Sequence, residues 1–63
     1  MKTNDVIKHL YKVREIKFKN RAGSIKTKLI SVQKKFDGEK IDIYLECLHP
    51  EIRINIREIE AIK

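Results

Sequence analysis

The 63-residue sequence predicts a mainly β fold in which a short N-terminal helix precedes five antiparallel strands. Apolar and polar residues alternate over most of the chain after residue 14, and this is the period of half-buried strands. An Asp37-Gly38 pair stands between two β-branched runs, which is the strongest short-range signal for a hairpin. One run shifts its alternation at Leu29-Ile30, which indicates a bulge or sharp bend within a long strand.

The helix is expected over about residues 4–13, as two to three turns. Its apolar residues follow the i, i+1, i+4, i+5 pattern of one helical face. They are Val6, Ile7, Leu10 and Tyr11. Asn4 is the expected N-cap, and Asp5 suits the positive end of the helix dipole. Because so short a helix is unstable alone, we expect this face to pack on the strands.

The strands are expected over about residues 14–19, 24–36, 39–47, 51–57 and 59–62. A two-residue Asp37-Gly38 turn would pair Phe36 with Glu39 and place Val32 opposite Ile43. The alternation predicts Thr27 to point inward with its apolar neighbours, and Arg57-Glu58 to form a corner before the last strand, which would pair back with the first. Such a meander is the layout of a small SH3-like or Sm-like barrel, open or closed, in one domain of residues 1–63.

The composition sets bounds on the class of protein. So short a chain has a small core, and association into a homo-oligomer would help to stabilise it. Cys47 is the one cysteine, so no intrachain disulfide is expected. The sequence has no apolar run of the ~18 residues that a membrane span needs, and no signal-like stretch near its start. We therefore expect a cytoplasmic protein without a membrane partner.

The chain is strongly basic, with 15 Lys and Arg against 9 Asp and Glu, a net charge of +6 and a pI near 9.7. This balance favours nucleic acid or an acidic protein surface as the partner. The alternative is that the lysines serve solubility alone. Charge by itself leaves the two explanations open.

The expected register gathers part of the positive charge on strands one and two. A four-residue turn would place Lys17 opposite Lys26, a like-charge pair that costs up to about 1 kcal/mol. The candidate nucleic-acid-binding residues of this face are Lys17, Lys19, Arg21, Lys26 and Lys28. An uncompensated positive patch suits a phosphate backbone, with little dependence on base sequence. The alternative is a solvated lysine face that deters edge-to-edge aggregation.

A second candidate binding set comprises Tyr44, Arg53, Arg57, Lys34 and Lys35. Both arginines are expected opposite acids across strands three and four, Arg53 facing Glu46 and Arg57 facing Asp42. Tyr44 would lie between Asn55 and Ser31 on the outward face. It either stacks on a base or ring, or packs under the N-terminal helix, and the second reading is slightly favoured.

The sequence offers no group of residues typical of catalysis. His9, His49 and Cys47 are the imaginable nucleophile or metal set, but they are too few and have no recognised spacing for zinc. Cys47 falls on the inward phase, where a free cysteine is usually an inert apolar residue. Two glycines make no phosphate loop. We expect no enzyme activity, no metal and no cofactor.

One stretch carries a family pattern: Ile43-Tyr44-Leu45-Glu46-Cys47, followed by Ile54-Asn55-Ile56-Arg57-Glu58-Ile59. Residues 14–62 resemble the WYL domain, a Sm-like barrel of bacterial transcription regulators and defence-associated proteins. The Tyr, the Leu and the closing Ile match the family motif, whereas Ile43 stands in place of its Trp. Asn55 stands in place of an arginine, and Arg57-Glu58 in place of an Asp-Arg pair, so the family's ligand-contacting arginines carry over only loosely, as Arg53 or Arg57. The last strands are also similar to the barrel of YolD-like proteins.

Three functional hypotheses follow. The first is a small, non-enzymatic, nucleic-acid-associated or transcription-regulatory module that binds phosphates through the basic face. The second is a protein-interaction module, an inhibitor or adaptor of the kind that phages and mobile elements encode, which binds an acidic surface of a host protein or uses a sheet edge. The third is a homo-oligomeric structural barrel.

Overall fold

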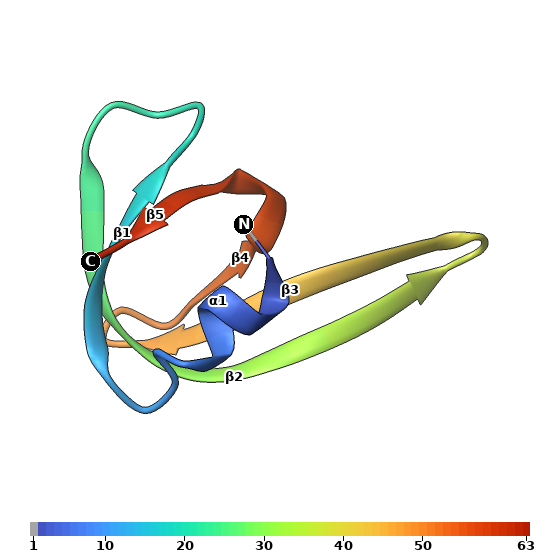
Figure 1. Ribbon diagram of the computed structural model, residues 1–63, viewed down its shortest axis with the longest axis horizontal. Helices are drawn as coiled ribbons and strands as arrows, with labels where there is room; N and C mark the ends of the chain where they lie inside the picture. The colour runs from blue at the N-terminus through green and yellow to red at the C-terminus, as the bar shows by residue number, and fades with distance from the viewer. Residues whose placement is uncertain (1) are drawn as a thin grey trace.

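The computed structural model describes residues 2–63 and contains one antiparallel sheet with a short helix against it (Figure 1). The elements are α1 (Thr3–Ile7), β1 (Val13–Phe18), β2 (Ser24–Asp37), β3 (Lys40–Leu48), β4 (Ile52–Asn55), the 3₁₀ helix η1 (Ile56–Glu58) and β5 (Ile59–Ile62). The strand order is β4-β3-β2-β1-β5. The mainly β class, the N-terminal helix and the long second strand are confirmed.

The sheet curls because its two end strands are joined by a very short connection. β5 pairs with β1, as predicted, and only the three residues of η1 separate it from β4 at the other end of the strand order. The Asn55 side chain caps this corner by accepting a hydrogen bond of 3.0 Å from the backbone N–H of Arg57. No ladder joins β4 to β5 among residues 2–63, so a closed barrel stays a prediction.

The core lies on one face of the curled sheet, and α1 packs against that face (Figure 1). Its buried apolar residues are Val6, Ile16, Phe18, Leu29, Leu45, Cys47, Ile54, Ile56 and Ile59. Cys47 is 2% exposed, which confirms its inward phase. Every strand contributes to this cluster. Because side chains alternate along a strand, the polar residues between these apolar ones lie on the outer face of the sheet.

β2 changes partners along its 14 residues. Residues 24–28 pair with β1 and residues 28–37 pair with β3, so Lys28 has a partner on both sides. The register shifts between Leu29 and Ser31, so Ile30 is the extra residue of a bulge, as the phase change predicted. Beyond the bulge the β2–β3 hairpin projects from the body (Figure 1). We call residues 33–41 the arm; all of them are exposed, including Ile41, which was predicted to face inward.

The turn of this hairpin differs from the expected one. Asp37 pairs with Lys40, so the two loop residues are Gly38 and Glu39. Gly38 has a φ of +61°, and a glycine at the first central position is typical of a type II′ turn. The register is therefore two residues from the predicted one. A shift of two leaves each side chain on the expected face, and Val32 lies opposite Leu45 instead of Ile43.

β1 and β2 also pair two residues away from the predicted register. Lys17 lies opposite Ser24, so the predicted Lys17–Lys26 pair is wrong. The cause is the last strand. Phe18 pairs with Ile59, which draws the end of β1 away from β2 and lengthens the β1–β2 connection. The outward side chains still point outward, because the shift is again two.

α1 is shorter than predicted, spanning Thr3–Ile7 instead of about residues 4–13, with Lys2 at the N-cap. Only part of the predicted apolar face packs: Val6 is fully buried, whereas Ile7 and Tyr11 are 48% and 75% exposed. The chain leaves the helical path because the Tyr11 N–H donates to the Leu29 carbonyl at 2.7 Å. This bond begins the pairing of the chain with β2, so the helix cannot continue through Tyr11.

β3 and β4 pair in the predicted register. Glu46 lies opposite Arg53, and Tyr44 lies opposite Asn55. The connection between the strands contains a cis peptide bond between His49 and Pro50. β4 ends at Asn55, before the predicted limit of residue 57, because η1 forms the corner that Arg57-Glu58 predicted.

Candidate functional site

The five cations of the first predicted set are all exposed, and all belong to the β1–β2 hairpin. They are Lys17 of β1, Lys19 and Arg21 of the connecting turn, and Lys26 and Lys28 of β2. The Arg21 guanidinium carbon lies 5.2 Å from the centroid of the Phe18 ring, within the range of a cation–π contact. This contact orients one cation of the turn and covers the edge of the core.

Two carboxylates lie among these cations, so the face is less positive than predicted. The Lys17 Nζ lies 3.3 Å from Glu60 Oε2, and Lys26 lies opposite Glu15. The Lys17 and Glu60 side chains are 54% and 52% exposed, so water screens their attraction and the pair contributes under about 1 kcal/mol. Lys28 is different, because its cross-strand neighbours are the apolar Val13 and Leu48. The positive charge is therefore least compensated at the Lys28 end of the hairpin.

A further group of cations adjoins Lys28. We call residues 8–14, which comprise the segment between α1 and β1 and the first two residues of β1, the basic connection. Its permanently charged residues are Lys8, Lys12 and Arg14. It meets β2 where Val13 lies opposite Lys28 and where the Leu29 N–H donates to the Lys12 carbonyl at 3.0 Å. The backbones of the two segments are thus held side by side, with Lys28 on the outer face of the hairpin and Arg14, opposite the buried Thr27, on the inward phase of β1.

The imidazole of His9 reports the positive potential of this region. Its pKa is lowered from the ordinary value of 6.5, first by partial burial and then by the charges of Lys8, Arg14 and Lys12. Asp5 opposes the shift but does not reverse it. The contribution of the three cations, which is smaller than that of burial, reflects a positive local potential that favours an anion.

Sequence reasoning missed the basic connection because it assigned Tyr11 to the packed face of a longer helix. A signal for it was present in the distribution of charge. Residues 1–36 contain eleven Lys or Arg but two Asp or Glu. Residues 37–63 contain four Lys or Arg and seven Asp or Glu. The basic half of the sequence forms α1, β1 and β2, so the asymmetry along the chain becomes an asymmetry between parts of the sheet.

The arginines of the second predicted set are compensated by acids across the sheet. The Arg53 Nη2 lies 3.0 Å from Glu46 Oε1, and the Arg57 Nη1 lies 3.9 Å from Asp42 Oδ1. Both predicted pairs are confirmed. This face is therefore nearly self-neutralised and is a weaker candidate for an anionic partner than the Lys28 end.

Tyr44 is half-buried on the same outer face, between Asn55 on β4 and Gln33 on β2. Its other neighbour is thus Gln33 instead of the predicted Ser31. The adjacent Leu45 belongs to the core cluster on which α1 packs. Because successive side chains of a strand point to opposite faces, α1 lies on the other side of β3 from Tyr44, contrary to the favoured reading.

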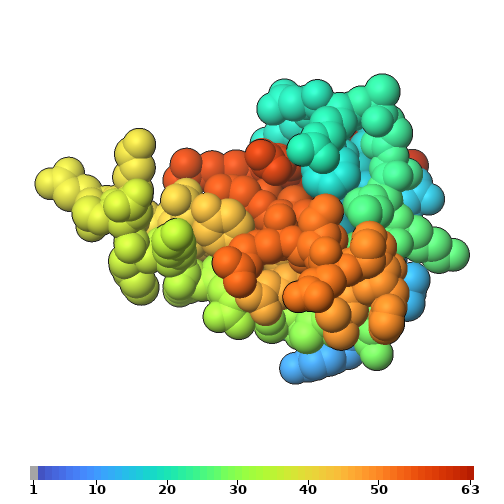
Figure 2. Space-filling model, turned by 180° about the vertical axis from the view of Figure 1, so that it is seen from behind, coloured from blue at the N-terminus to red at the C-terminus, as the bar shows by residue number. Residues whose placement is uncertain are grey.

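Lys34 and Lys35 lie on the arm, which Figure 2 shows as a narrow projection from the body. Both are exposed. Acids lie among the lysines: Asp37 pairs with Lys40, and Asp42 lies opposite Lys35. The arm is therefore not a basic patch, although it carries two of the predicted cations.

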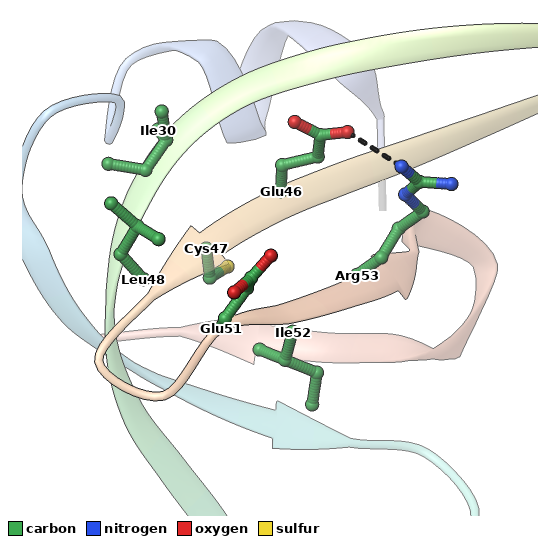
Figure 3. A pocket seen from close by; sticks show the side chains of 7 residues that line it. All are labelled: Ile30, Glu46, Cys47, Leu48, Glu51, Ile52 and Arg53. Atoms are coloured by element: carbon green, nitrogen blue, oxygen red, sulfur yellow. Dashed lines mark hydrogen bonds and ion pairs between the residues drawn. The ribbon is translucent and has the colours of Figure 1, made fainter.

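A pocket of about 390 Å³ opens between the β2 bulge and the β3–β4 hairpin (Figure 3). Its lining residues are Ile30, Glu46, Cys47, Leu48, Glu51, Ile52 and Arg53. Figure 3 shows the Glu46–Arg53 contact at one end and Ile30 with Leu48 at the other. Ser31 Oγ donates a second hydrogen bond to Glu46, at 3.3 Å. Glu46 is thus engaged by two donors and is poorly placed to act on a ligand.

The chemistry of this pocket is further limited by its thiol. Burial raises the pKa of Cys47, and a hydrogen bond with Thr27 lowers it by less, so the thiol stays protonated and is a weak nucleophile near neutral pH. Within residues 2–63, no three His, Cys, Asp or Glu side chains gather closely enough to hold a metal ion. The helices of the described chain are all too short or too polar to cross a membrane.

The basic connection and the Lys28 end of the hairpin are therefore the strongest candidate site, on grounds of exposure and uncompensated charge. The likeness to WYL and YolD-like proteins stays a prediction, because no family model, no curated protein and no solved structure matches this chain.

Proposed function

We propose that this protein is a non-enzymatic module that binds the phosphate backbone of nucleic acid. The binding surface comprises the basic connection and the adjoining Lys26 and Lys28 of β2, and we call it the basic surface. The observation that carries the proposal is the concentration of cations where the start of β1 meets β2; the exposed ones are Lys8, Lys12, Lys26 and Lys28. Charge placed in this way favours a polyanion.

The physical basis of the proposal is the release of counterions from the nucleic acid. Each phosphate neutralised by a Lys or Arg frees condensed cations, so the affinity falls steeply as salt rises. Contacts to phosphates alone also fix orientation without reading the bases. We therefore expect binding that depends strongly on salt and weakly on sequence.

The test compares two double variants that change the net charge equally. Lys26→Glu with Lys28→Glu reverses charges on the basic surface, and Lys35→Glu with Lys40→Glu reverses charges on the arm. Anisotropy of a labelled oligonucleotide, measured at several salt concentrations, gives the affinity and its salt slope. We expect the first variant to lose about tenfold or more in affinity and to lower the slope by about one per lost contact, whereas the second changes both much less. Equal losses in the two variants would show that net charge, and not this surface, governs binding.

A specific observation favours a second candidate function, protein binding through the arm. Phe36 is 70% exposed and lies opposite Ile41, which is 49% exposed. Both are on the face that continues inward through Ile43 and Val32 to the buried Leu45. An apolar strip thus runs along β3 from the core to Ile41 and its partner Phe36, with Lys34, opposite Ile43, beside it on the same face.

The partner that this strip fits best is a second copy of the chain. Lysines and acids are interleaved along the arm, so two arms related by a twofold axis would complement each other's charges. A net acidic partner would gain less, because the arm has little excess positive charge. The small core of so short a chain would also be extended by such a contact.

A further inference from the structure

Tyr11 is an aromatic residue in an unusual place. Its φ is +67°, in the left-handed region that residues other than Gly, Asn and Asp rarely adopt. Its side chain is 75% exposed, the highest value among the large hydrophobic residues that are exposed in this structure. A ring in this position contributes little to the core, so packing does not explain it.

The backbone of Tyr11 is nevertheless well fixed. Its N–H donates to the Leu29 carbonyl at 2.7 Å, and the Leu29 N–H donates to the Lys12 carbonyl at 3.0 Å. The Lys12 N–H donates in turn to the His9 carbonyl at 3.3 Å. These bonds tie the basic connection to β2 on both sides of the ring. The backbone that carries the ring is therefore held in place before a ligand binds, so binding costs little backbone conformational entropy.

The segment that carries the ring is cationic. Lys8, Lys12 and Arg14 share its segment, and Lys28 adjoins them through its cross-strand partner Val13. No Asp or Glu occurs between Asp5 and Glu15 in the sequence. An exposed aromatic ring among cations combines the two groups that a nucleotide needs, one for its base and one for its phosphate.

We propose that Tyr11 is a stacking platform for an unpaired base of single-stranded nucleic acid, whose phosphates are held by the exposed Lys8, Lys12 and Lys28. This proposal rests on the function proposed above and adds its substrate class. In a duplex the bases are stacked on one another and hide their faces, whereas a single strand can lay a base on the ring. Tyr44, the other tyrosine, is half-buried beside compensated arginines and does not combine an open ring with free cations.

The chain provides its own probe for this contact. It contains two tyrosines and no tryptophan, so in Tyr44→Phe the emission of Tyr11 is observed alone. We expect a short single-stranded oligonucleotide to quench this emission, and a duplex of the same sequence to quench it much less. In the matched variant Tyr11→Phe, which reports Tyr44 and keeps a ring at position 11, the same single strand should bind without comparable quenching.

Affinities measured by anisotropy separate stacking from charge. Tyr11→Asn removes the ring, and asparagine tolerates a positive φ, so the backbone is preserved. We expect Tyr11→Asn to weaken single-strand binding about 5- to 100-fold while duplex binding and the salt slope change little, and Tyr11→Phe to bind nearly as the unchanged protein does. Circular dichroism and thermal unfolding verify that each variant is folded.

The outcomes distinguish this proposal from the one on which it rests. Salt-dependent binding without Tyr11 quenching, and with equal affinities for Tyr11→Asn and the unchanged protein, would overturn the stacking platform and leave backbone binding intact. A duplex bound as tightly as a single strand, with the same quenching, would overturn the preference for unpaired bases. The absence of binding to either form at low salt would overturn both proposals.

Discussion

Thr27 shows how one polar side chain is accommodated within the core. It is 1% exposed, and its Oγ1 donates to the Leu48 carbonyl at 2.8 Å and approaches the Pro50 carbonyl at 3.3 Å. The hydroxyl therefore ties β2 to the β3–β4 connection, which the sequence could not reveal, because Thr27 and Leu48 are 21 residues apart. The inward direction of Thr27 was predictable from alternation alone, and it is confirmed.

Thr27→Val is expected to lower the free energy of unfolding by about 1–3 kcal/mol. Valine keeps the shape of the side chain but leaves the partly buried Leu48 carbonyl without its donor. Urea denaturation followed by circular dichroism measures the change. Thr27→Ser is the control, since it retains the hydroxyl, and it should lose less stability than Thr27→Val if the hydrogen bonds matter more than the methyl group. A Thr27→Val protein as stable as the unchanged one would show that hydrogen bonding by the Thr27 hydroxyl contributes nothing to stability.

His9 provides a pH-dependent readout of the basic surface. Burial and then Lys8, Arg14 and Lys12 lower its pKa from 6.5, so the unfolded chain takes up this proton first as the pH falls below 6.5. His9 therefore contributes a loss of stability between pH 6.5 and its lower folded-state pKa. Bound phosphates would favour the imidazolium and should raise this pKa.

Nuclear magnetic resonance titration of the His9 ring protons measures this shift. His49→Gln identifies the His9 signal, because the chain has two histidines. We expect the pKa of His9 to rise when a saturating oligonucleotide is added. A pKa that is the same with and without the bound oligonucleotide would place the phosphates elsewhere.

At the scale of elements, registers were predictable where both strands alternate without interruption and no third strand competes. β3 and β4 are such a pair, and Glu46 lies opposite Arg53 as expected. The β1–β2 register was not predictable, because Phe18 pairs with Ile59 of β5, a strand near the other end of the sequence. The Asp-Gly signal located the hairpin correctly but did not decide whether Gly38 is the first or the second loop residue.

The arm is the element whose behaviour separates the two candidate functions. Sedimentation equilibrium over a range of concentrations should show a dimer that Phe36→Glu converts to a monomer, because the charge would be buried between two apolar strips. The variant should remain as stable as the monomeric protein, since Phe36 is 70% exposed. Lys35→Gln, on the other face of the arm, should leave the dimer unchanged. A chain that is monomeric at every concentration would contradict self-association through the arm.

At the scale of the whole molecule, the fold converts a charge gradient along the sequence into differently charged strands of one sheet. The basic N-terminal half forms α1, β1 and β2, and the more acidic second half forms β3, β4 and β5. Acids from the second half compensate Lys17 through Glu60, but none is paired across a strand with Lys28. The excess charge is thereby concentrated at one end of the β1–β2 hairpin.

The candidate site was predictable only in part. Alternation placed Lys26 and Lys28 on an exposed face, and the structure keeps them there. The basic connection was not predictable, because the spacing of Val6, Leu10 and Tyr11 is also that of a longer amphipathic helix. The hydrogen bond from Tyr11 to Leu29 decides between the two, and it depends on a strand 18 residues further along the chain.

The central claim is that the basic surface receives the nucleic acid, and amide chemical-shift mapping of the isotope-labelled protein tests it most directly. A short single-stranded oligonucleotide is titrated in at low salt, and each backbone amide is followed. We predict that the largest shifts fall on residues 8–14 and 26–28, and that the arm and β4 change little. Shifts concentrated on the arm or on the β3–β4 face, with residues 8–14 unaffected, would contradict the claim.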